Sequence, residues 1–165
     1  MNYLVRDLLQ LSNMDAERMK WDITIIEPRE WIGEILESMQ ALAAEKNQVL
    51  EGEVSDHISS FYADDHGSSQ VLVNILSNAI KYTPEGGRIV VRAKNYGTRV
   101  HLEVADNGVG IPKEDLDRIF ERFYRVDKSR SKATGGTGLG FAIVKHIALL
   151  HDAKIDLQSQ VGTGT

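Results

Sequence analysis

The chain has 165 residues, with 19 Lys and Arg against 24 Asp and Glu, and its net charge of −5 at pH 7 does not favour nucleic acid as a partner. Cysteine is absent, which excludes disulfides, a thiolate nucleophile and a zinc finger. No apolar run approaches the ~18 residues that span a bilayer and no signal-peptide pattern opens the chain, so we expect a soluble chain that is not inserted in a membrane.

Residues 1–20 predict an amphipathic helix, because Leu4, Leu8 and Leu11 recur at helical spacing. No capping residue precedes this helix, which indicates a cut through a longer helix of a parent protein. A frayed natural terminus is the alternative.

Residues 21–63 predict one helix among short strands. Segment 21–28 is β-rich, and Pro28 is a favourable first residue for the helix that follows. The apolar stripe of this helix comprises Trp31, Ile32, Ile35, Leu36, Met39 and Leu42. Asn47 is the expected left-handed stop, and strands are expected at 48–54 and 59–63.

A helix over 68–82 carries an unusual polar stripe. Its apolar face comprises Leu72, Ile75, Leu76, Ala79 and Ile80, and its polar stripe comprises Asn74, Asn78, Lys81 and Tyr82. Asn is a mediocre helix former, so two of them one turn apart are unexpected on an ordinary solvated face. Amide oxygens suit a hard cation and an ammonium suits phosphate, although a merely polar face is the alternative.

A hairpin of strands 88–94 and 100–105 leads into the glycine turn 106–112. Gly108 and Gly110 allow a ligand to approach the backbone closely, and the Asp106 carboxylate at the strand end can accept from an exocyclic amine. An ordinary Asp-Asn-Gly turn is the alternative.

The rest of the chain predicts a helix at 113–123, a basic glycine-rich loop at 124–140, a helix at 139–151 and a strand at 154–161. The glycines of this loop precede a helix N-terminus, which suits a polyphosphate, and a flexible hinge is the alternative. Basic residues from Arg118 to Lys132 either face that phosphate or are simply solvated. The order of elements predicts a two-layer α+β sandwich of mostly antiparallel strands with helices on one side.

Four motifs in this order resemble the ATP-binding domain of sensor histidine kinases, within the gyrase, chaperone, histidine kinase and MutL ATPase superfamily. Residues 74–84 resemble its N box, 106–112 its G1 box, 120–125 its F box and 136–140 its G2 box. The resemblance implies a Bergerat-type fold, with a mixed sheet and helices on one face. It assigns 1–20 to the end of a dimerisation and phosphoacceptor helix, and 21–165 to an ATP-binding domain cut off at its C-terminus, so that its final strand is missing.

The resemblance implies an ATP site with Mg²⁺ as its metal. Asn78 would coordinate Mg²⁺, and Asn74 would support phosphate or metal-bound water. Lys81 would neutralise phosphate charge and Arg125 would reach the γ-phosphate, which makes these two the expected catalytic residues. The flexible lid over the phosphates would contribute Gly136, Thr137, Gly138, Leu139 and Gly140.

The resemblance also implies a nucleoside pocket. Asp106 would accept the adenine amino group, and Tyr82 would line the pocket. Gly108, Gly110 and Ile111 would shape the base slot.

The implied function is that of the catalytic domain of a bacterial two-component kinase, which transfers the γ-phosphoryl of ATP to a His on a phosphoacceptor domain absent from this chain. The implied partners are that domain, in a homodimeric parent, and through it a response regulator. The domain would be cytoplasmic, and its parent would be anchored in the bacterial membrane.

Three departures from the family pattern matter. No His of this chain has the acceptor context, and Asp152-Ala153 stands where a Gly-Gly turn is usual. The chain would also stop inside the last glycine turn, so that the closing strand of the family is missing. Apart from these departures, Asn74 stands where related ATPases and a serine kinase of the superfamily place a Glu as general base. An amide cannot deprotonate water or a hydroxyl, so hydrolysis and serine phosphorylation are disfavoured. The alternatives are a nucleotide-binding module without turnover and a related ATPase.

Overall fold

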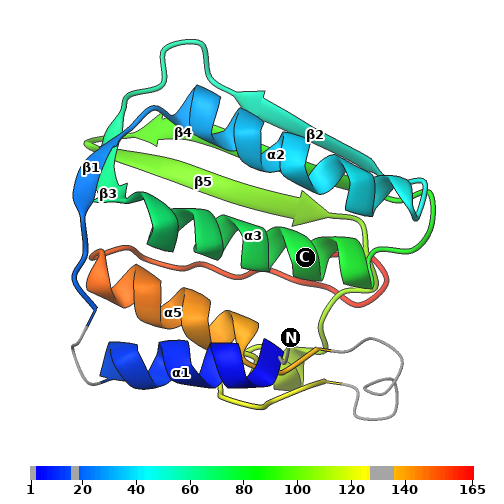
Figure 1. The fold of residues 1–165 in the computed structure, drawn as a ribbon. Coiled ribbons are helices and arrows are strands. Elements are labelled where there is room, and N and C mark those ends of the chain that lie inside the picture. Colours follow the sequence, from blue (N-terminus) through cyan, green and yellow to red (C-terminus); the bar gives the residue numbers. More distant parts are fainter. Residues whose placement is uncertain (1–2, 16–18, 127–135) are drawn as a thin grey trace.

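The computed structural model describes residues 3–15, 19–126 and 136–165 (Figure 1). Along the chain its elements are α1 Tyr3–Asp15, β1 Ile23–Ile26, α2 Pro28–Ala44, β2 Val49–Val54, β3 Phe61–Asp64, α3 Asp65–Tyr82, β4 Arg88–Tyr96, β5 Arg99–Asp106, the 3₁₀ turn η1 Lys113–Asp115 and α5 Gly140–Leu150. None of these helices combines the length and the apolar character needed to cross a membrane.

The main sheet has the strand order β2-β4-β5. β2 runs parallel to β4, with Val49 opposite Arg88, and β4 runs antiparallel to β5, with Ile89 opposite Asp106. β1 and β3 form a separate antiparallel pair. With α2 and α3 on one side of the main sheet in Figure 1, this arrangement confirms the predicted α+β sandwich with a mixed sheet.

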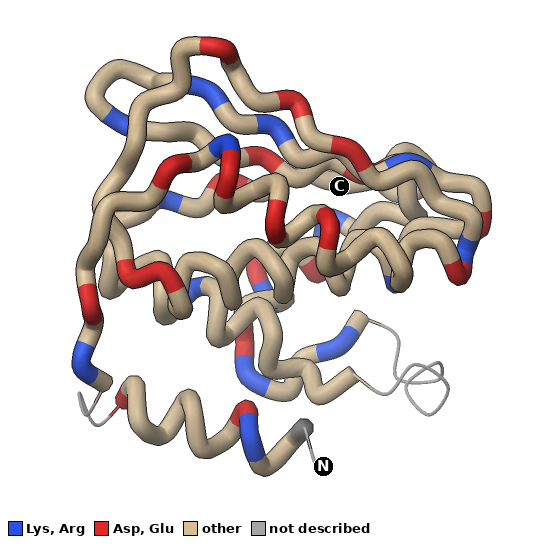
Figure 2. Tube along the Cα trace, turned by 45° about the horizontal axis from the view of Figure 1, so that its top comes forward, with Lys and Arg blue, Asp and Glu red and all other residues tan. Residues whose placement is uncertain are grey.

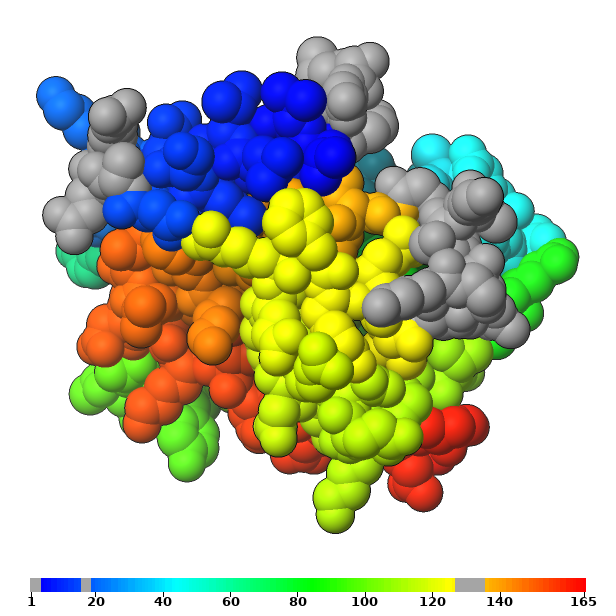
Figure 3. Space-filling view, turned by 90° about the horizontal axis from the view of Figure 1, so that it is seen from below, coloured from blue at the N-terminus to red at the C-terminus, as the bar shows by residue number. Residues whose placement is uncertain are grey.

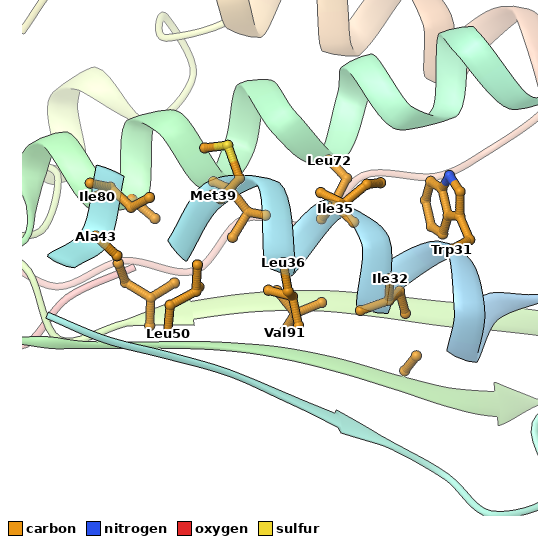
Figure 4. Packing of buried hydrophobic residues seen from close by; sticks show 14 of the residues in the cluster. Trp31, Ile32, Ile35, Leu36, Met39, Ala43, Leu50, Leu72, Ile80 and Val91 are labelled. Atoms are coloured by element: carbon orange, nitrogen blue, oxygen red, sulfur yellow. The ribbon is translucent and has the colours of Figure 1, made fainter. Parts of the chain in front are cut away.

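Helix α2 covers the sheet with the apolar stripe expected from the sequence. Figure 4 shows Leu36 above Val91 of β4 and Ile35 beside Leu72 of α3. Gly52 in β2 makes room for this packing, because a Cβ there would lie 2.7 Å from Leu36 Cδ1. Burial of each such Leu or Ile contributes about 1.5–3 kcal/mol.

The other face of the sheet is charged. Arg88 of β4 pairs with Glu51 of β2, and Arg92 Nη1 lies 2.6 Å from Glu103 Oε1 of β5. Figure 2 shows acidic and basic segments alternating across these neighbouring strands. One apolar face and one solvated face explain why the described part of the domain has two layers.

A second apolar cluster joins α1 to α5. Leu11 and Met14 are each 2% exposed and pack with Leu139, Ile143 and Ile147. Figure 3 shows α1, in blue, beside α5, in orange, and beside the yellow segment of residues 113–126.

Two predicted elements are wrong. The helix expected at 113–123 is only the 3₁₀ turn η1 followed by turns, because the N–H groups of Leu116, Arg118 and Glu121 donate to the carbonyl three residues earlier. At the end of the segment Phe123 has a positive φ of 65°, and its N–H donates to the carbonyl of Gly138. The strand expected at 154–161 is not formed. Of these eight residues, all of them described, only Gln160 forms a bridge, an isolated one to Gly164. A strand needs a neighbour to pair with, and alternation of apolar residues does not supply one.

Two turns use non-glycine residues with positive φ. Asn47 has a φ of 49°, as expected of the residue that ends the α2 region. Asp152, which stands where the family has Gly, has a φ of 51°. Asn and Asp tolerate this conformation better than most residues, so the turn after α5 is kept without glycine.

Candidate functional site

Helix α3 positions the two asparagines of the site. Asp64 caps this helix by accepting from the Gly67 N–H at 2.6 Å. Asn78 Nδ2 donates to the Asn74 carbonyl at 3.1 Å. This hydrogen bond uses the amide nitrogen, so the side-chain oxygen of Asn78 can act as an acceptor or metal ligand. Asn74 Nδ2 donates to the carbonyl of Gly140 at 3.3 Å, so the asparagine stripe faces the first residue of α5.

Two cationic side chains converge on Gly136. Arg125 Nη1 donates to the carbonyl of Gly136 at 2.8 Å. A Cβ on Gly136 would lie 2.6 Å from Lys81 Nζ and 3.5 Å from Arg125 Nη2. Lys81 Nζ also lies 5.3 Å from the ring centroid of Tyr82. The ammonium, the guanidinium and a glycine backbone therefore meet in one place, which suits an anion.

The glycine loop before α5 is held by residues on both sides. Gly138 has a φ of 74°, and its carbonyl accepts from the Phe123 N–H at 2.9 Å. Thr137 Oγ1 donates to Asp7 Oδ2 of α1 at 2.9 Å. The Leu139 side chain is fully buried in the second apolar cluster, so any contact of Leu139 with a ligand would come from its backbone. Residues 127–135 of the expected lid, with Lys128, Arg130 and Lys132, lie outside the described residues.

Asp106 lies at the end of β5, at the other end of the site. Its Oδ1 accepts from the Gly108 N–H at 2.8 Å and from the Thr165 N–H at 3.3 Å. Burial raises the pKa of the Asp106 carboxyl, and these two hydrogen bonds oppose the rise. A half-buried carboxylate with well-defined partners is a suitable acceptor for an amino group.

The glycines after Asp106 allow close packing of the loop on α3. A Cβ on Gly108 would lie 2.7 Å from the Tyr82 carbonyl oxygen. Gly110 has a φ of 74°, and a Cβ there would overlap the carbonyl of Gln160. The Val109 N–H donates to the Tyr82 carbonyl at 3.1 Å, which joins this loop to the end of α3.

Sequence reasoning missed two hydroxyl residues beside Asp106. Ser159 Oγ accepts from the Ile111 N–H at 2.7 Å and lies 2.8 Å from Thr165 Oγ1. Thr165 also accepts from the Asp106 N–H through its carbonyl, at 2.8 Å. No local pattern marks either residue, because their contacts are with a loop far away in the sequence.

Two basic residues that could have faced a phosphate have other partners. Arg122 Nη2 lies 2.7 Å from Asp15 Oδ2 of α1. Arg118 stacks on the ring of Tyr124, at 4.3 Å from its centroid, and lies beside Glu121. Of the described basic residues in this segment, Arg125 is therefore the one placed against the glycine loop.

Comparison with known proteins agrees with this geometry. Residues 63–165 match the family described as histidine kinase-, DNA gyrase B-, and HSP90-like ATPase. The chain is 36% identical over 162 residues to the sensor-like histidine kinase SenX3 of Mycolicibacterium smegmatis, covering 98% of this chain and 42% of that protein. It is 38% identical over 170 residues to the sensor histidine kinase WalK of Bacillus subtilis, covering 98% of this chain and 27% of that protein. The chain thus spans less than half the length of these curated relatives.

Solved structures show the same fold. Full-length ShkA in complex with AMPPNP superposes with a TM-score of 0.86 at 29% identity, over 98% of this chain and 33% of that chain. The nucleotide-free catalytic domain of histidine kinase ThkA superposes with a TM-score of 0.67 at 28% identity, over 76% of this chain and 79% of that chain. The chain therefore belongs to the family of histidine kinase-, DNA gyrase B- and HSP90-like ATPases, as an ATP-binding catalytic domain of the sensor histidine kinase type.

Proposed function

We propose that this domain binds Mg-ATP and transfers the γ-phosphoryl group to a His on a phosphoacceptor domain outside the chain. The observation that carries the proposal is the meeting of Lys81 and Arg125 at Gly136, with the asparagines of α3 beside Gly140. Phosphoryl transfer needs positioning and charge neutralisation more than covalent chemistry from the protein, and this arrangement supplies both.

The base end of the site would select adenine. Asp106 would accept the amino group of the base, and its hydrogen bonds from Gly108 and Thr165 hold the carboxylate in place. Gly108, Gly110 and Ile111 would form the wall of the base slot, and the exposed ring of Tyr82 would line the nucleoside pocket.

The donor set fits Mg²⁺ rather than a metal held by the protein alone. The described residues contain no group of three or more His, Asp or Glu side chains that could hold a metal. Mg²⁺ in such sites is bound by one or two protein oxygens together with substrate phosphates and waters. Asn78 would hold the ion through its amide oxygen and Asn74 would support it, and bound Mg²⁺ would neutralise charge on the phosphates.

Lys81 and Arg125 would act on the phosphates directly. The Lys81 ammonium would offset the charge of the bound nucleotide, and the Arg125 guanidinium would contact the γ-phosphate as its charge redistributes during transfer. The backbone N–H groups of residues 136–140, at the N-terminus of α5, would close over the phosphates.

The chain lacks a base for hydrolysis at the position where related ATPases have one. Asn74 donates to the carbonyl of Gly140 and has no proton-accepting nitrogen or carboxylate. The proton of the attacking group would therefore be taken outside this chain, by an acidic neighbour of the acceptor His. This distinction favours a kinase over an ATPase.

Helix α1 would be the end of the dimerisation and phosphoacceptor domain, so the chain would divide into residues 1–20 and 21–165. Four apolar residues of α1 are exposed, Leu4, Val5, Leu8 and Leu9, which suits packing against further helices of such a domain. The partners would be that domain, in a homodimeric parent, and a response regulator that receives the phosphoryl group from it. The domain would be cytoplasmic, and its parent would be anchored in the membrane.

A nucleotide-binding module without turnover is the second candidate, because no His of this chain has the acceptor context. To separate the two, ATP is titrated with Mg²⁺, and the separate phosphoacceptor domain is then added with radiolabelled ATP. Binding followed by label on the added domain supports a kinase, and binding alone supports a module. Absence of ATP binding, or label on the isolated chain itself, would contradict the proposal.

A further inference from the structure

A lysine outside the recognised motifs holds the end of α3. Lys46, in the connection between α2 and β2, donates through Nζ to the carbonyls of Ile80 at 2.8 Å, Lys81 at 3.1 Å and Thr83 at 2.6 Å. These are carbonyls of the last helical turn and of the residue after it, which have no partner within the helix. A cation at the carbonyl end also interacts favourably with the helix dipole.

Gln48 reinforces the same contact from the start of β2. Its Nε2 donates to the carbonyls of Ile80 at 2.9 Å and Thr83 at 2.6 Å. Gln48 is 8% exposed and Thr83 is fully buried, so water has little access to these carbonyls. Buried carbonyls without partners cost free energy, and the two side chains remove that cost.

The same helix end carries the loop that begins with Asp106. Among the carbonyls of residues 80–83, that of Tyr82 accepts from neither Lys46 nor Gln48. It accepts from the Val109 N–H at 3.1 Å. Gly108 lies directly against it, since a Cβ there would be 2.7 Å from the Tyr82 oxygen and 3.0 Å from Thr83 Oγ1. A shift of the Tyr82–Thr83 backbone would therefore move the loop that holds Asp106.

We propose that Lys46 is a positioning residue of the nucleotide site, which fixes the carbonyl end of α3 and through it the base-facing loop 106–110. This inference rests on the proposed function, in which Asp106 reads the adenine amino group. Lys46 touches no nucleotide; it acts through the Tyr82 carbonyl and the Val109 N–H. Loss of its ammonium should loosen the base end of the site and leave the metal end unchanged, because Asn78 is held by the Asn74 carbonyl.

Two variants of Lys46 test whether its cationic donor group is needed. Lys46→Met keeps the length of the side chain and removes its donors, and Lys46→Arg keeps the charge and several donors. Lys94→Met is the matched control, because Lys94 is an exposed lysine on β4. Thermal unfolding establishes that each variant is folded at the temperature of the other measurements.

The first measurement is amide hydrogen exchange without nucleotide. Lys46→Met should speed exchange of the Val109 amide about tenfold or more, and should leave the Ile143 amide of α5 unchanged. Lys46→Arg should restore most of the protection, and Lys94→Met should resemble the wild type. This measurement needs no nucleotide, so it tests the contact even if the proposed function fails.

The second measurement compares the affinities for ATP and GTP with and without Mg²⁺. Lys46→Met should lower the preference for ATP over GTP about tenfold and leave the gain from Mg²⁺ as it is in the wild type. A lower melting temperature with an unchanged ATP preference would reduce Lys46 to an ordinary stabilising residue and overturn the proposal. Unchanged Val109 exchange, or failure of Lys46→Arg to restore the preference, would overturn it as well. If the wild type does not bind ATP, the proposed function fails, and Val109 exchange alone decides whether Lys46 holds the loop.

Discussion

Arg125 donates from Nη1 to the carbonyl of Gly136 at 2.8 Å, and so places its guanidinium on the glycine loop that precedes α5. The Lys81 ammonium approaches the same glycine from α3. Because both side chains lie close to the same glycine, a phosphate bound there would be contacted by both.

Arg125→Ala should lower phosphoryl transfer far more than it lowers ATP affinity. A guanidinium directed at the γ-phosphate acts mainly where charge redistributes in the transition state, so we expect a loss of about 100-fold or more in transfer rate. The measurement is transfer from radiolabelled ATP to a separately supplied phosphoacceptor domain, beside an equilibrium titration of ATP. Arg118→Ala, which removes an exposed arginine paired with Glu121, is the control. Transfer at the parental rate by Arg125→Ala would show that this role is wrong.

Asn78→Ala should weaken ATP binding in the presence of Mg²⁺ more than Asn74→Ala does. Asn78 would be the direct ligand of the ion, whereas Asn74 would support it, and we expect the loss for Asn78→Ala to be at least about tenfold. The two affinities should become similar when EDTA removes the metal. Equal affinities of Asn78→Ala and wild type with Mg²⁺ present would contradict the assignment.

Asp106→Asn should reduce the preference for adenine. The amide offers one acceptor and one donor where the carboxylate offers only acceptors, so an unpaired polar group is left against the base, at a cost on the order of 1–3 kcal/mol. Titrations with ATP and GTP measure the effect. A loss of the same size for both nucleotides would argue against base reading by Asp106.

The same substitution should change how stability depends on pH. Burial raises the pKa of Asp106 in the folded chain, so between the unfolded pKa, about 3.9, and the higher folded pKa the native state holds more protons than the unfolded state. Asp106 therefore reduces stability as pH rises through this window, and the reduction is complete above the folded pKa. Without nucleotide, Asp106→Asn should be more stable than the wild type at pH 7, and the difference should vanish below the unfolded pKa. Urea unfolding at several pH values tests this, with the exposed Asp117→Asn as control.

Local sequence patterns were sufficient for much of the fold. The apolar stripe of α2 is buried from Trp31 to Met39, although Leu42 at its end is 42% exposed. Helix α3 has its predicted apolar face, with Leu72 and Leu76 buried. These predictions depend on contacts within one element or on one face of it, which helical periodicity encodes directly.

Contacts between distant segments could not be predicted. The parallel pairing of β2 with β4 depends on the placement of α3 between them in the chain, and no residue pattern in either strand marks it. The fold brings Lys46 to the end of α3, behind the site, and it brings Ser159 and Thr165 to the loop that begins with Asp106. The end of the segment 113–123 is another such case, because the Phe123 N–H donates to the carbonyl of Gly138 and not to a carbonyl of its own segment.

Alanine at Gly108 and alanine at Gly136 should have different effects on the free energy of unfolding. On Gly108 a methyl group would meet the Tyr82 carbonyl at 2.7 Å, and on Gly136 it would meet Lys81 Nζ at 2.6 Å. The backbone at Tyr82 is held by neighbouring hydrogen bonds and cannot retreat cheaply, so Gly108→Ala should lower the free energy of unfolding by about 1–3 kcal/mol. The end of a lysine side chain can move aside, so Gly136→Ala should change that free energy by less than about 0.5 kcal/mol.

The same two variants should differ in which ligand they bind more weakly, ATP or adenosine. Because Gly136→Ala displaces the Lys81 ammonium from the loop, it should weaken binding of ATP more than binding of adenosine, which has no phosphate. Gly108→Ala should weaken both, since it moves the loop that carries Asp106. Urea unfolding and the two titrations on each variant give the comparison. If Gly136→Ala weakened adenosine as much as ATP, the loop at Gly136 would not be the phosphate end of the site.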